Sequence, residues 1–363
     1  MKVLHFHRSL GAGGIESVVC NLANAMAETE DVTVGTVFHQ SPDSYYFSRL
    51  GERVHRISLN KVDDTKKPIK EILMMPFLIG KGHYDIVHIH GYFYYYILAV
   101  LLLHKKTKFY YTLHSVAQYE GPPWDKRVQR IKTLFFKKNW MRPITISEMA
   151  RDSFEKMYGR DSRLIYNGVP SPSIGIIPDY RGLFNFSNDT RVFLHPGRIT
   201  YPKNQLVLCK VFDRLICEGF DIALLIAGEN HDNGIFSSLE PYFSDRIRYI
   251  GVRQDLTELM SFSDGLCLPS IFEGFSLVLV EGLAVGCVPI CTKVGVAPEV
   301  IIDGANGILS ESPSEDDYYS AMNRFLALSS EELDNMRSAC KHQFIQFEIH
   351  NAATQYLQYY RES

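Results

Sequence analysis

The chain has 363 residues, of which 46% are hydrophobic and 22% are charged, a composition that is ordinary for a soluble globular protein and excludes a disordered one. This length exceeds the usual size of one hydrophobic core, so we expect two domains. The net charge is -3, but residues 1–166 carry +8 (24 basic, 16 acidic) and residues 167–363 carry -11 (14 basic, 25 acidic). The asymmetry predicts that the N-terminal half faces an anionic partner such as a membrane surface, with a coincidence of surface composition as the alternative.

The seven cysteines include no Cys-x-x-Cys pair and lie mostly in apolar runs, which predicts buried free thiols in a reducing compartment. The N-terminus lacks the apolar region of a signal peptide and is typical of a first strand. The most hydrophobic stretch, residues 92–103, is too short to cross a bilayer. We therefore expect a cytoplasmic protein, with peripheral contact at the inner face of the membrane left open.

Short apolar runs alternate with segments of helical periodicity along the first half, the pattern of a doubly wound α/β sheet. An apolar stripe predicts a helix from about Ile15 to Met26. The strands predicted in this half are 3–7, 32–38, 86–90, 109–114 and 143–146.

A second series of elements follows a break. Residues 167–190 contain three glycines and three prolines, which predicts a linker between domains. Strands are predicted at 192–195, 223–227, 248–250, 265–268 and 288–292, and helices at about 203–218 and within 314–360.

A glycine-rich turn, Arg-Ser-Leu-Gly-Ala-Gly-Gly-Ile-Glu at residues 8–16, joins the first strand to the first helix. Glycine lets the backbone approach a ligand closely, and the helix N-terminus offers unpaired N–H groups, so Gly13 and Gly14 are candidates for holding a phosphate. The dinucleotide fingerprint is only half met, because Gly11 and Gly13 fit but Glu16 does not. A tight connection without a ligand remains the alternative.

Two cations, Arg198 and Lys203, flank the step from the first strand of the second half into its helix. Their convergence beside a helix N-terminus suits a diphosphate, although isolated cations of this kind are more often solvated.

The most specific motif runs from Ser270 to Glu281 after the strand at 265–268. Glu273 is expected in the loop at the carboxyl edge of the sheet, where open α/β folds bind ligands, and Glu281 a turn inside the following helix. The two carboxylates suit a sugar hydroxyl and a ribose at opposite ends of a nucleotide sugar. Backbone N–H groups at the helix start come from Gly274, Phe275, Ser276 and Leu277.

Together these motifs resemble the retaining GT-B glycosyltransferases, in particular the group called GT4 or glycosyl transferases group 1. The Gly-Gly-Ile-Glu turn, Pro-Gly-Arg-x4-Lys and Glu-x7-Glu occur in the family's order and spacing. The resemblance implies two Rossmann-like, doubly wound domains facing across a cleft. Residues 1–170 would form the acceptor-side domain, residues 190–344 the nucleotide-sugar domain, and a C-terminal helix at about 345–363 would pack back on the first.

Carried over position by position, the resemblance places the Gly14 backbone, Arg198 and Lys203 at the diphosphate. It places Glu273 at the donor-sugar hydroxyls and Glu281 at the ribose.

Two further positions follow from the same resemblance. His114, in Tyr-Thr-Leu-His, matches a family histidine beside the donor sugar, and we group it with Glu273 as catalytic. The loop Ile-Gly-Val-Arg that contains Val252 matches the region that edges the base.

The implied activity is retaining, metal-independent transfer of a sugar from a nucleotide diphosphate, UDP by family frequency, to an acceptor hydroxyl. Cell-surface polysaccharide or glycolipid synthesis is the expected setting, and we expect no metal, no cofactor beyond the donor substrate and no nucleic acid. The alternatives are a nucleotide-sugar epimerase or hydrolase of the same fold and a non-catalytic nucleotide-sugar-binding protein. An NAD-dependent dehydrogenase is disfavoured, because the first turn lacks its third glycine.

Two more features, a pair of histidines and a basic aromatic segment, are interpreted from their spacing. His88 and His90 alternate on one strand and so share a face, but no third metal ligand is apparent, and structural histidines are the favoured interpretation. Residues 126–140 mix cations and aromatics at helical spacing, which suits an interfacial helix that binds a membrane carrying a lipid-linked acceptor. An ordinary helix covering the sheet is nearly as well supported.

Overall fold

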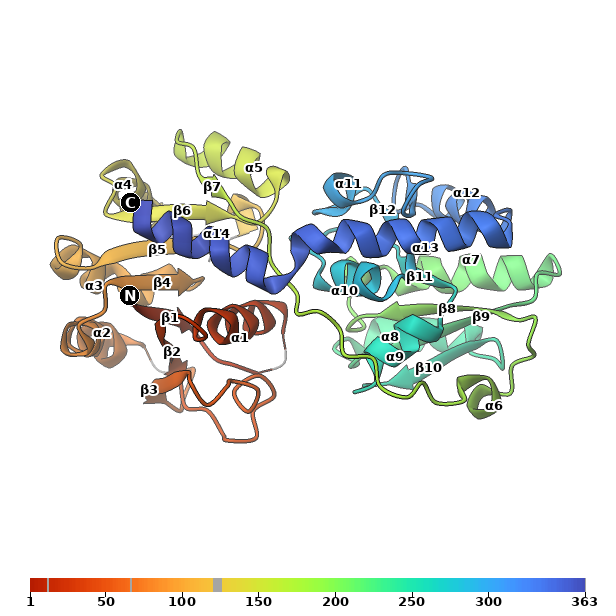
Figure 1. The fold of residues 1–363 in the computed structure, drawn as a ribbon, viewed down its shortest axis with the longest axis horizontal. Helices are drawn as coiled ribbons and strands as arrows, with labels where there is room; N and C mark the ends of the chain where they lie inside the picture. The colour runs from red at the N-terminus through yellow and green to blue at the C-terminus, as the bar shows by residue number, and fades with distance from the viewer. Residues whose placement is uncertain (12, 66, 120–125, 363) are drawn as a thin grey trace. The chain divides into compact units, whose positions relative to one another are not determined.

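The computed structural model describes residues 1–11, 13–65, 67–119 and 126–362. The chain divides into two compact units, of which unit 1 comprises Met1–Pro170 and the segment from Phe347 onward. Unit 2 comprises Ser171–Gln346. Each unit has its own parallel sheet with helices between most successive strands (Figure 1), which confirms the doubly wound α/β class.

The sheet of unit 1 has seven strands in the order β3-β2-β1-β4-β5-β6-β7. The strand order reverses between the neighbouring strands β1 and β4. The switch point of unit 1 therefore lies at the carboxyl ends of these two strands. The strands are β1 (Lys2–His7), β2 (Asp31–Phe38), β3 (His55–Lys61), β4 (Ile86–His90), β5 (Lys108–Leu113), β6 (Met141–Thr145) and β7 (Arg163–Leu164).

Helices cover the two faces of this sheet with separate cores. One core lies under α2, α3, α4 and α5, and the other lies under α1 and α14. The last helix therefore packs beside the first, as the blue and red ribbons of Figure 1 show. The helices are α1 (Gly14–Met26), α2 (Ile69–Gly82), α3 (Ile97–Leu103), α4 (Lys126–Lys137), α5 (Glu148–Tyr158) and α14 (Ile349–Glu362).

The sheet of unit 2 has six strands in the order β10-β9-β8-β11-β12-β13, with its switch point between β8 and β11. The strands are β8 (Arg191–Pro196), β9 (Ile222–Ala227), β10 (Ile247–Gly251), β11 (Gly265–Leu268), β12 (Val288–Thr292) and β13 (Ile308–Ser310). The helices are α6 (Tyr180–Phe184), α7 (Gln205–Cys217), α8 (Asn233–Leu239), α9 (Leu256–Phe262), α10 (Leu277–Val285), α11 (Ala297–Val300), α12 (Glu315–Leu326) and α13 (Ser330–Phe344).

Aromatic side chains form part of the core of unit 2 between sheet and helices. Phe193 on β8 meets Phe212 on α7 and Phe325 on α12, each at a ring-centroid distance of 5.3 Å in edge-to-face geometry. These contacts hold α7, whose N-terminus follows the Arg198–Lys203 segment, against the sheet.

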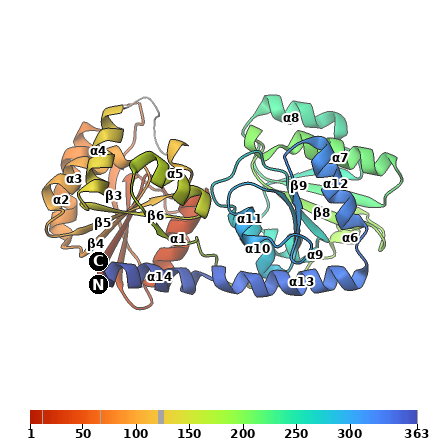
Figure 2. The same cartoon turned by 90° about the horizontal axis from the view of Figure 1, so that it is seen from above.

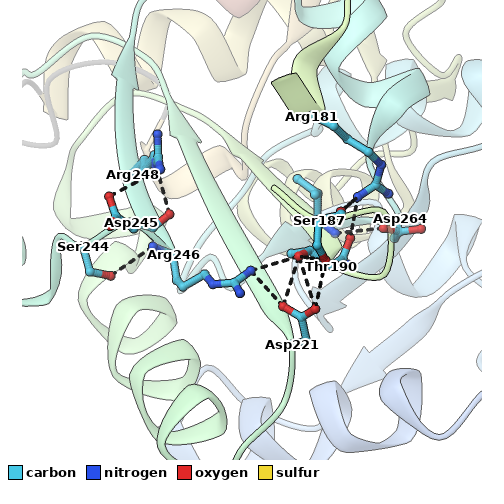
Figure 3. Close-up of polar contacts among 10 residues, drawn as sticks. Arg181, Ser187, Thr190, Asp221, Ser244, Asp245, Arg246, Arg248 and Asp264 are labelled. Atoms are coloured by element: carbon cyan, nitrogen blue, oxygen red, sulfur yellow. Dashed lines mark hydrogen bonds and ion pairs between the residues drawn. The ribbon is translucent and has the colours of Figure 1, made fainter. Parts of the chain in front are cut away.

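Polar residues that precede the parallel strands of unit 2 converge at the amino edge of its sheet (Figure 3). Arg246 Nη1 lies 2.8 Å from Asp221 Oδ1 and donates to Thr190 Oγ1 at 3.0 Å. Asp264 Oδ2 accepts from the Val192 N–H at 2.8 Å. This network fixes the strand starts at the edge opposite the one where ligands bind in such folds, so its role is structural.

The structure adds elements that periodicity did not reveal. β3, β7 and β13 were absent from the predicted strands, since β3 is half exposed, β7 has only two residues and β13 has only three. The segment 126–140 contains α4, and its two phenylalanines, Phe135 and Phe136, are fully buried in the core of unit 1. Its apolar face is thus a core face, which corrects the interfacial interpretation. Six of the seven cysteines are buried and all are free thiols.

Candidate nucleotide-sugar site

The predicted residues of the second half gather at the switch point of unit 2. Arg198 and Lys203 follow β8, and the Ser270–Leu277 segment follows β11, the strand beside it. Parallel neighbours end at the same edge of the sheet, so the two segments meet where open α/β sheets bind ligands.

Backbone contacts fix the segment after β8. The Gly197 N–H donates to the Ala227 carbonyl at 2.8 Å, and the Ile199 N–H donates to the Glu229 carbonyl at 2.9 Å. Gly228 has φ +149°, and a Cβ there would lie 2.0 Å from the Gly197 carbonyl oxygen. Only glycine permits this close approach, which places Arg198 at the sheet edge.

The side chains of the two cations differ in their surroundings. Arg198 is exposed, and its guanidinium has no hydrogen bond or ion pair with the described residues. Lys203 ends the short helical turn Tyr201–Lys203 and forms an ion pair with Glu273, the side chains being 22% and 16% exposed. A positive side chain without a partner beside a paired one leaves the edge able to attract an anion.

Glu273 is held by a second contact and a tight backbone neighbour. Ser270 Oγ donates to its Oε1 at 3.0 Å. Gly295, with φ +59°, comes so close that a Cβ there would lie 2.9 Å from Glu273 Cβ. Thr292 Oγ1, at the end of β12, donates to the Ser270 carbonyl at 2.5 Å, which fixes the start of the loop that contains Glu273.

The helix after this loop is α10, which starts at Leu277 with Ser276 as its N-cap and ends at Gly286. The Ser276 side chain makes no capping hydrogen bond, so the first N–H groups of a nine-residue helix face the loop that contains Glu273. Gly274 and Phe275 lie half-buried in that loop, before the helix begins.

Glu281 lies on α10, half-buried, and its carboxylate has no hydrogen-bond or ion-pair partner in the part of the chain that the structure describes. Burial raises the pKa of this carboxyl above its ordinary value. A ligand whose hydroxyl groups donate hydrogen bonds to this carboxylate would lower the free energy of keeping it charged in a buried place. Val252, directly after β10, is 70% exposed.

The predicted residues of unit 1 lie at that unit's own switch point. Gly13 caps α1 and Gly14 is its first residue, at the end of the turn that follows β1. A Cβ on Gly13 would lie 2.3 Å from a carboxylate oxygen of Glu16, so the acidic side chain folds back over the helix start. This carboxylate occupies the place predicted for a phosphate, and an anion there has to displace it.

His114 follows β5 and is half-buried beside other histidines. Its Nε2 lies 3.0 Å from His90 Nδ1, and His90 Nε2 lies 3.1 Å from His5 Nδ1. Burial lowers the pKa of His5 and of His114 to about 3, with a smaller effect of His7 on His114. Burial also holds the pKa of His90 well below its ordinary value, so these rings are neutral at pH 7.

A metal-binding geometry exists in this cluster, because ring nitrogens of His5, His88 and His90 all lie within 4.8 Å of one another. His5 supplies the third ligand that the spacing of His88 and His90 did not reveal. Yet each ring nitrogen of the three is already used, since His88 meets Tyr360 Oη and Thr112 Oγ1, each at 2.6 Å. The cluster therefore fits a hydrogen-bonded core better than a metal centre.

Sequence reasoning missed His5, His7 and Ser270. The first two alternate on β1 as His88 and His90 do on β4. His5 and His88 are paired in register, so they lie side by side on adjacent strands. The shared spacing of two residues between the histidines of each strand was the signal in the sequence that these side chains point to one face of the sheet.

In the described part of the chain, none of the helices has the length and apolar character needed to traverse a bilayer.

Models of known protein families match both halves of the chain. Residues 12–171 match "Glycosyltransferase Family 4", and residues 177–343 match "Glycosyl transferases group 1".

Curated relatives cover part of the chain. An uncharacterised glycosyltransferase of Methanocaldococcus jannaschii is 23% identical over 64% of this chain and 63% of its own length. The N-acetyl-alpha-D-glucosaminyl L-malate synthase of Bacillus anthracis is 30% identical over 35% of this chain and 34% of its own length. The chain thus spans less than two thirds of the length of these relatives.

Solved structures match over the full length. A glycosyltransferase from Rickettsia africae has a TM-score of 0.85 at 19% identity, covering 99% of this chain and 98% of its own. Anabaena HepE, solved in complex with UDP, has a TM-score of 0.82 at 18% identity, covering 100% of both chains. Likeness at such low identity establishes the fold, which is GT-B, with two Rossmann-like units. From the two family matches, the chain belongs to the GT4-type glycosyl transferases of group 1.

Proposed function

We propose that the protein is a glycosyltransferase that transfers a sugar from a nucleotide diphosphate to an acceptor hydroxyl. The observation that carries this proposal is the gathering of Arg198, the Lys203–Glu273 pair and the open N-terminus of α10 at the switch point of unit 2. Cations and helix N–H groups stabilise a diphosphate, and carboxylates accept hydrogen bonds from sugar hydroxyls.

In this proposal Arg198 and Lys203 bind the diphosphate of the donor. Negative charge grows on the leaving phosphate in the transition state, and preorganised cations and N–H groups at Gly274–Leu277 stabilise it. Glu273, released from Lys203, orients the sugar, and Glu281 accepts from the ribose hydroxyls. Val252 borders the base.

The finer features of the reaction are part of the same proposal. We propose retention at the anomeric carbon without a metal ion, because the phosphate groups have cations of the protein available and family resemblance favours this route. UDP is the proposed nucleotide, and the structural relative HepE was solved with UDP and with UDP-glucose. For unit 1 we propose that Gly14 and His114 contact ligand groups at that unit's sheet edge.

A ligand panel tests this function directly. Thermal shifts with UDP, GDP, ADP and their common sugars identify the nucleotide, and UDP release in the presence and absence of candidate acceptors separates transfer from hydrolysis. We expect a shift with one diphosphate at micromolar to millimolar concentration. No shift with any nucleoside diphosphate in the panel would contradict the proposal.

We also propose that unit 1 docks on an anionic bilayer through the outer faces of α2 and α3, which lie side by side (Figure 2). Both helices bury their inner faces in the same core and expose large apolar side chains outward. These are Ile69 (61% exposed), Leu73 (62%), Met74 (39%), Phe77 (71%), Leu101 (43%) and Leu102 (63%).

Basic residues accompany this apolar surface. Exposed Lys70 and Lys81 lie on α2, and exposed Lys105 and Lys106 follow α3, none of them ion-paired with a described residue. An exposed apolar patch flanked by cations is complementary to anionic lipid headgroups over acyl chains. A lipid-linked acceptor would be presented at such a surface, in glycolipid or cell-surface polysaccharide synthesis.

A further inference from the structure

Arg8 lies at the carboxyl edge of the unit 1 sheet, directly after β1. Its backbone is fixed there by β2, because the Arg8 carbonyl accepts hydrogen bonds from the Val37 N–H at 3.1 Å and the Phe38 N–H at 3.0 Å. The strand order reverses between β1 and β4, so the residue that follows β1 lies at the switch point of this sheet. Open α/β sheets bind their ligands at this place.

The guanidinium of Arg8 lies over two aromatic rings from neighbouring segments. Its Cζ is 4.9 Å from the ring centroid of Phe38, the last residue of β2, and 5.1 Å from that of Tyr92, which follows β4. Arg8 Nη1 also donates to Tyr92 Oη at 3.2 Å. Cation–π contacts with two rings restrict the rotamers of this long side chain, so the guanidinium is held in one orientation at the sheet edge.

The backbone of Tyr92 is strained. Its φ is +50° and its ψ is +43°, a left-handed conformation that residues other than glycine rarely adopt. The preceding residue, Gly91, is also left-handed, with φ +77°. Strained residues of this kind are concentrated at ligand sites, where the strain orients a side chain. At this site the oriented side chain is the ring that lies over Arg8.

The counterion of Arg8 in the structure is Asp64, which pairs with Nη2 from the loop after β3. The side chain of Asp64 is 62% exposed, whereas that of Arg8 is 29% exposed. An ion pair with one largely exposed partner contributes little to stability, so Asp64 can return to water at a small cost in free energy. Arg8 stays over its two rings, and an incoming anion can take the position of the Asp64 carboxylate.

We propose that Arg8 binds an anionic group, a phosphate or a carboxylate, of the acceptor. The assignment of this ligand as the acceptor rests on the proposed function. The planar guanidinium offers parallel N–H groups that match two oxygens of either anion. The Lys61 ammonium lies 5.7 Å from the centroid of the same Phe38 ring and adds positive charge beside the site. The acceptor class is therefore a hydroxyl compound with a negative charge, because a neutral sugar has no group that replaces the Asp64 carboxylate.

Three matched sugars test the required charge. D-glucose 6-phosphate, D-glucuronate and D-glucose are titrated into the full-length protein with saturating UDP, and ligand-observed NMR measures their affinities. We expect at least one of the two charged sugars to bind roughly tenfold or more tightly than glucose, the scale of one charge-assisted contact. The stronger of the two identifies the anion as phosphate or carboxylate. Equal affinities for all three sugars, or no binding of a charged one, would overturn the proposal.

Two variants should change the affinity for the charged sugar in opposite directions. Arg8→Gln should weaken it roughly tenfold, whereas Asp64→Asn should strengthen it several-fold, because the competing carboxylate is gone. The control Arg49→Gln changes another arginine of unit 1 that lies over a ring, 3.6 Å from the centroid of Tyr45, and should leave the affinity unchanged. If the Arg8–Asp64 pair were only structural, both variants would lower the melting temperature and neither would change the affinity. That result would contradict the proposal.

UDP affinity separates an acceptor site from a donor site. Arg8→Gln should bind UDP as the wild-type protein does. A loss of UDP affinity as large as the loss for the charged sugar would assign Arg8 to the diphosphate of the donor and overturn the acceptor assignment. If the wild-type protein binds no nucleoside diphosphate, the proposed function fails, and titration of the three sugars without UDP still decides whether Arg8 binds an anion.

Discussion

The ammonium group of Lys203 and the carboxylate of Glu273 form an ion pair although the two residues lie 70 positions apart in the chain. The two groups proposed to hold phosphate and sugar are thus bound to each other in the ligand-free protein. A nucleotide sugar exchanges this pair for two new contacts, since its phosphate takes Lys203 and its hydroxyls take Glu273. Binding of a bare diphosphate would instead leave Glu273 without its cation.

Arg198→Ala should weaken UDP binding by about 2 kcal/mol, or roughly 30-fold, the scale of one charge-assisted contact. Its melting temperature should not change, because the guanidinium has no partner among the described residues. Lys203→Ala should weaken UDP and also destabilise the fold slightly, since Glu273 loses its cation. Calorimetry measures the UDP affinity and thermal melts measure the stability, with Lys210→Ala on the following helix α7 as a control. Unchanged UDP affinity in both variants would refute the phosphate assignment.

Glu281 should have opposite effects on stability and on ligand binding. Burial raises its pKa in the folded protein, so the folded state binds this proton more tightly than the unfolded state does. The group therefore costs stability as pH rises above its ordinary pKa of about 4.3, and the cost is absent at lower pH. We expect Glu281→Gln to be more stable than wild type at pH 7 and equal to it near pH 4, in thermal melts without ligand. Lower stability at pH 7 would contradict this account.

UDP affinity distinguishes the roles of the two glutamates. Glu281→Ala should weaken both UDP and UDP-sugar, because both contain the ribose. Glu273→Gln should not weaken UDP binding, because Lys203 no longer has to leave a carboxylate, and it should lower donor turnover by about 100-fold, the scale of one positioned electrostatic contact. Calorimetry with UDP and a UDP-release assay separate the two effects. Equal loss of UDP binding in both variants would show that Glu273 is misassigned.

Gly295→Ala should displace Glu273, because Gly295 lies against the backbone and Cβ of that residue. The new Cβ would lie 2.9 Å from Glu273 Cβ and 3.0 Å from its carbonyl oxygen, and φ +59° adds strain of about 1 kcal/mol. We expect a lower melting temperature and reduced turnover. Gly304→Ala is the matched control, because it has φ +79° and no atom within 4 Å of the added Cβ. If both variants lose turnover equally, the effect is backbone strain and not displacement of Glu273.

The double variant Leu73→Ser/Phe77→Ser should reduce flotation with liposomes that contain anionic lipid. Each basic residue near such a surface contributes about 1 kcal/mol, so binding of the wild-type protein should also weaken as salt rises. Ile302→Ser, which changes a 63% exposed apolar residue of unit 2, serves as the control. Failure of the wild-type protein to float at low salt would exclude this surface as a membrane site.

Much of the fold was predictable because buried parallel strands leave a strong local pattern. The strand at 86–90 and the helix after Ser276 follow from apolar runs and from the terminating Gly286, and the structure has both. β3 was not predictable, since three of its seven residues are exposed and its pattern is broken by Lys61 and Asn60.

The site was predictable only as separate segments. Motif spacing selected Lys203 and Glu273, but their ion pair depends on β8 and β11 being neighbours, which no local pattern contains. The same holds for the hydrogen-bonded histidines His5, His90 and His114, which lie on β1, on β4 and directly after β5. The amphipathic segment 126–140 was ambiguous because a helix on a sheet and a helix on a membrane have the same periodicity.

Because α14 packs beside α1, the first unit is built from two stretches of chain separated by the whole of the second. A growing polypeptide therefore makes all of unit 2 before it makes the helix that closes one core of unit 1, where Tyr356 and Tyr360 are buried. During synthesis the apolar surface of α1 stays without its partner α14 while the roughly 320 residues between the two helices are made, at ~5–20 residues per second. The completion of unit 1 is thus a late, long-range event, which follows the synthesis of all of unit 2.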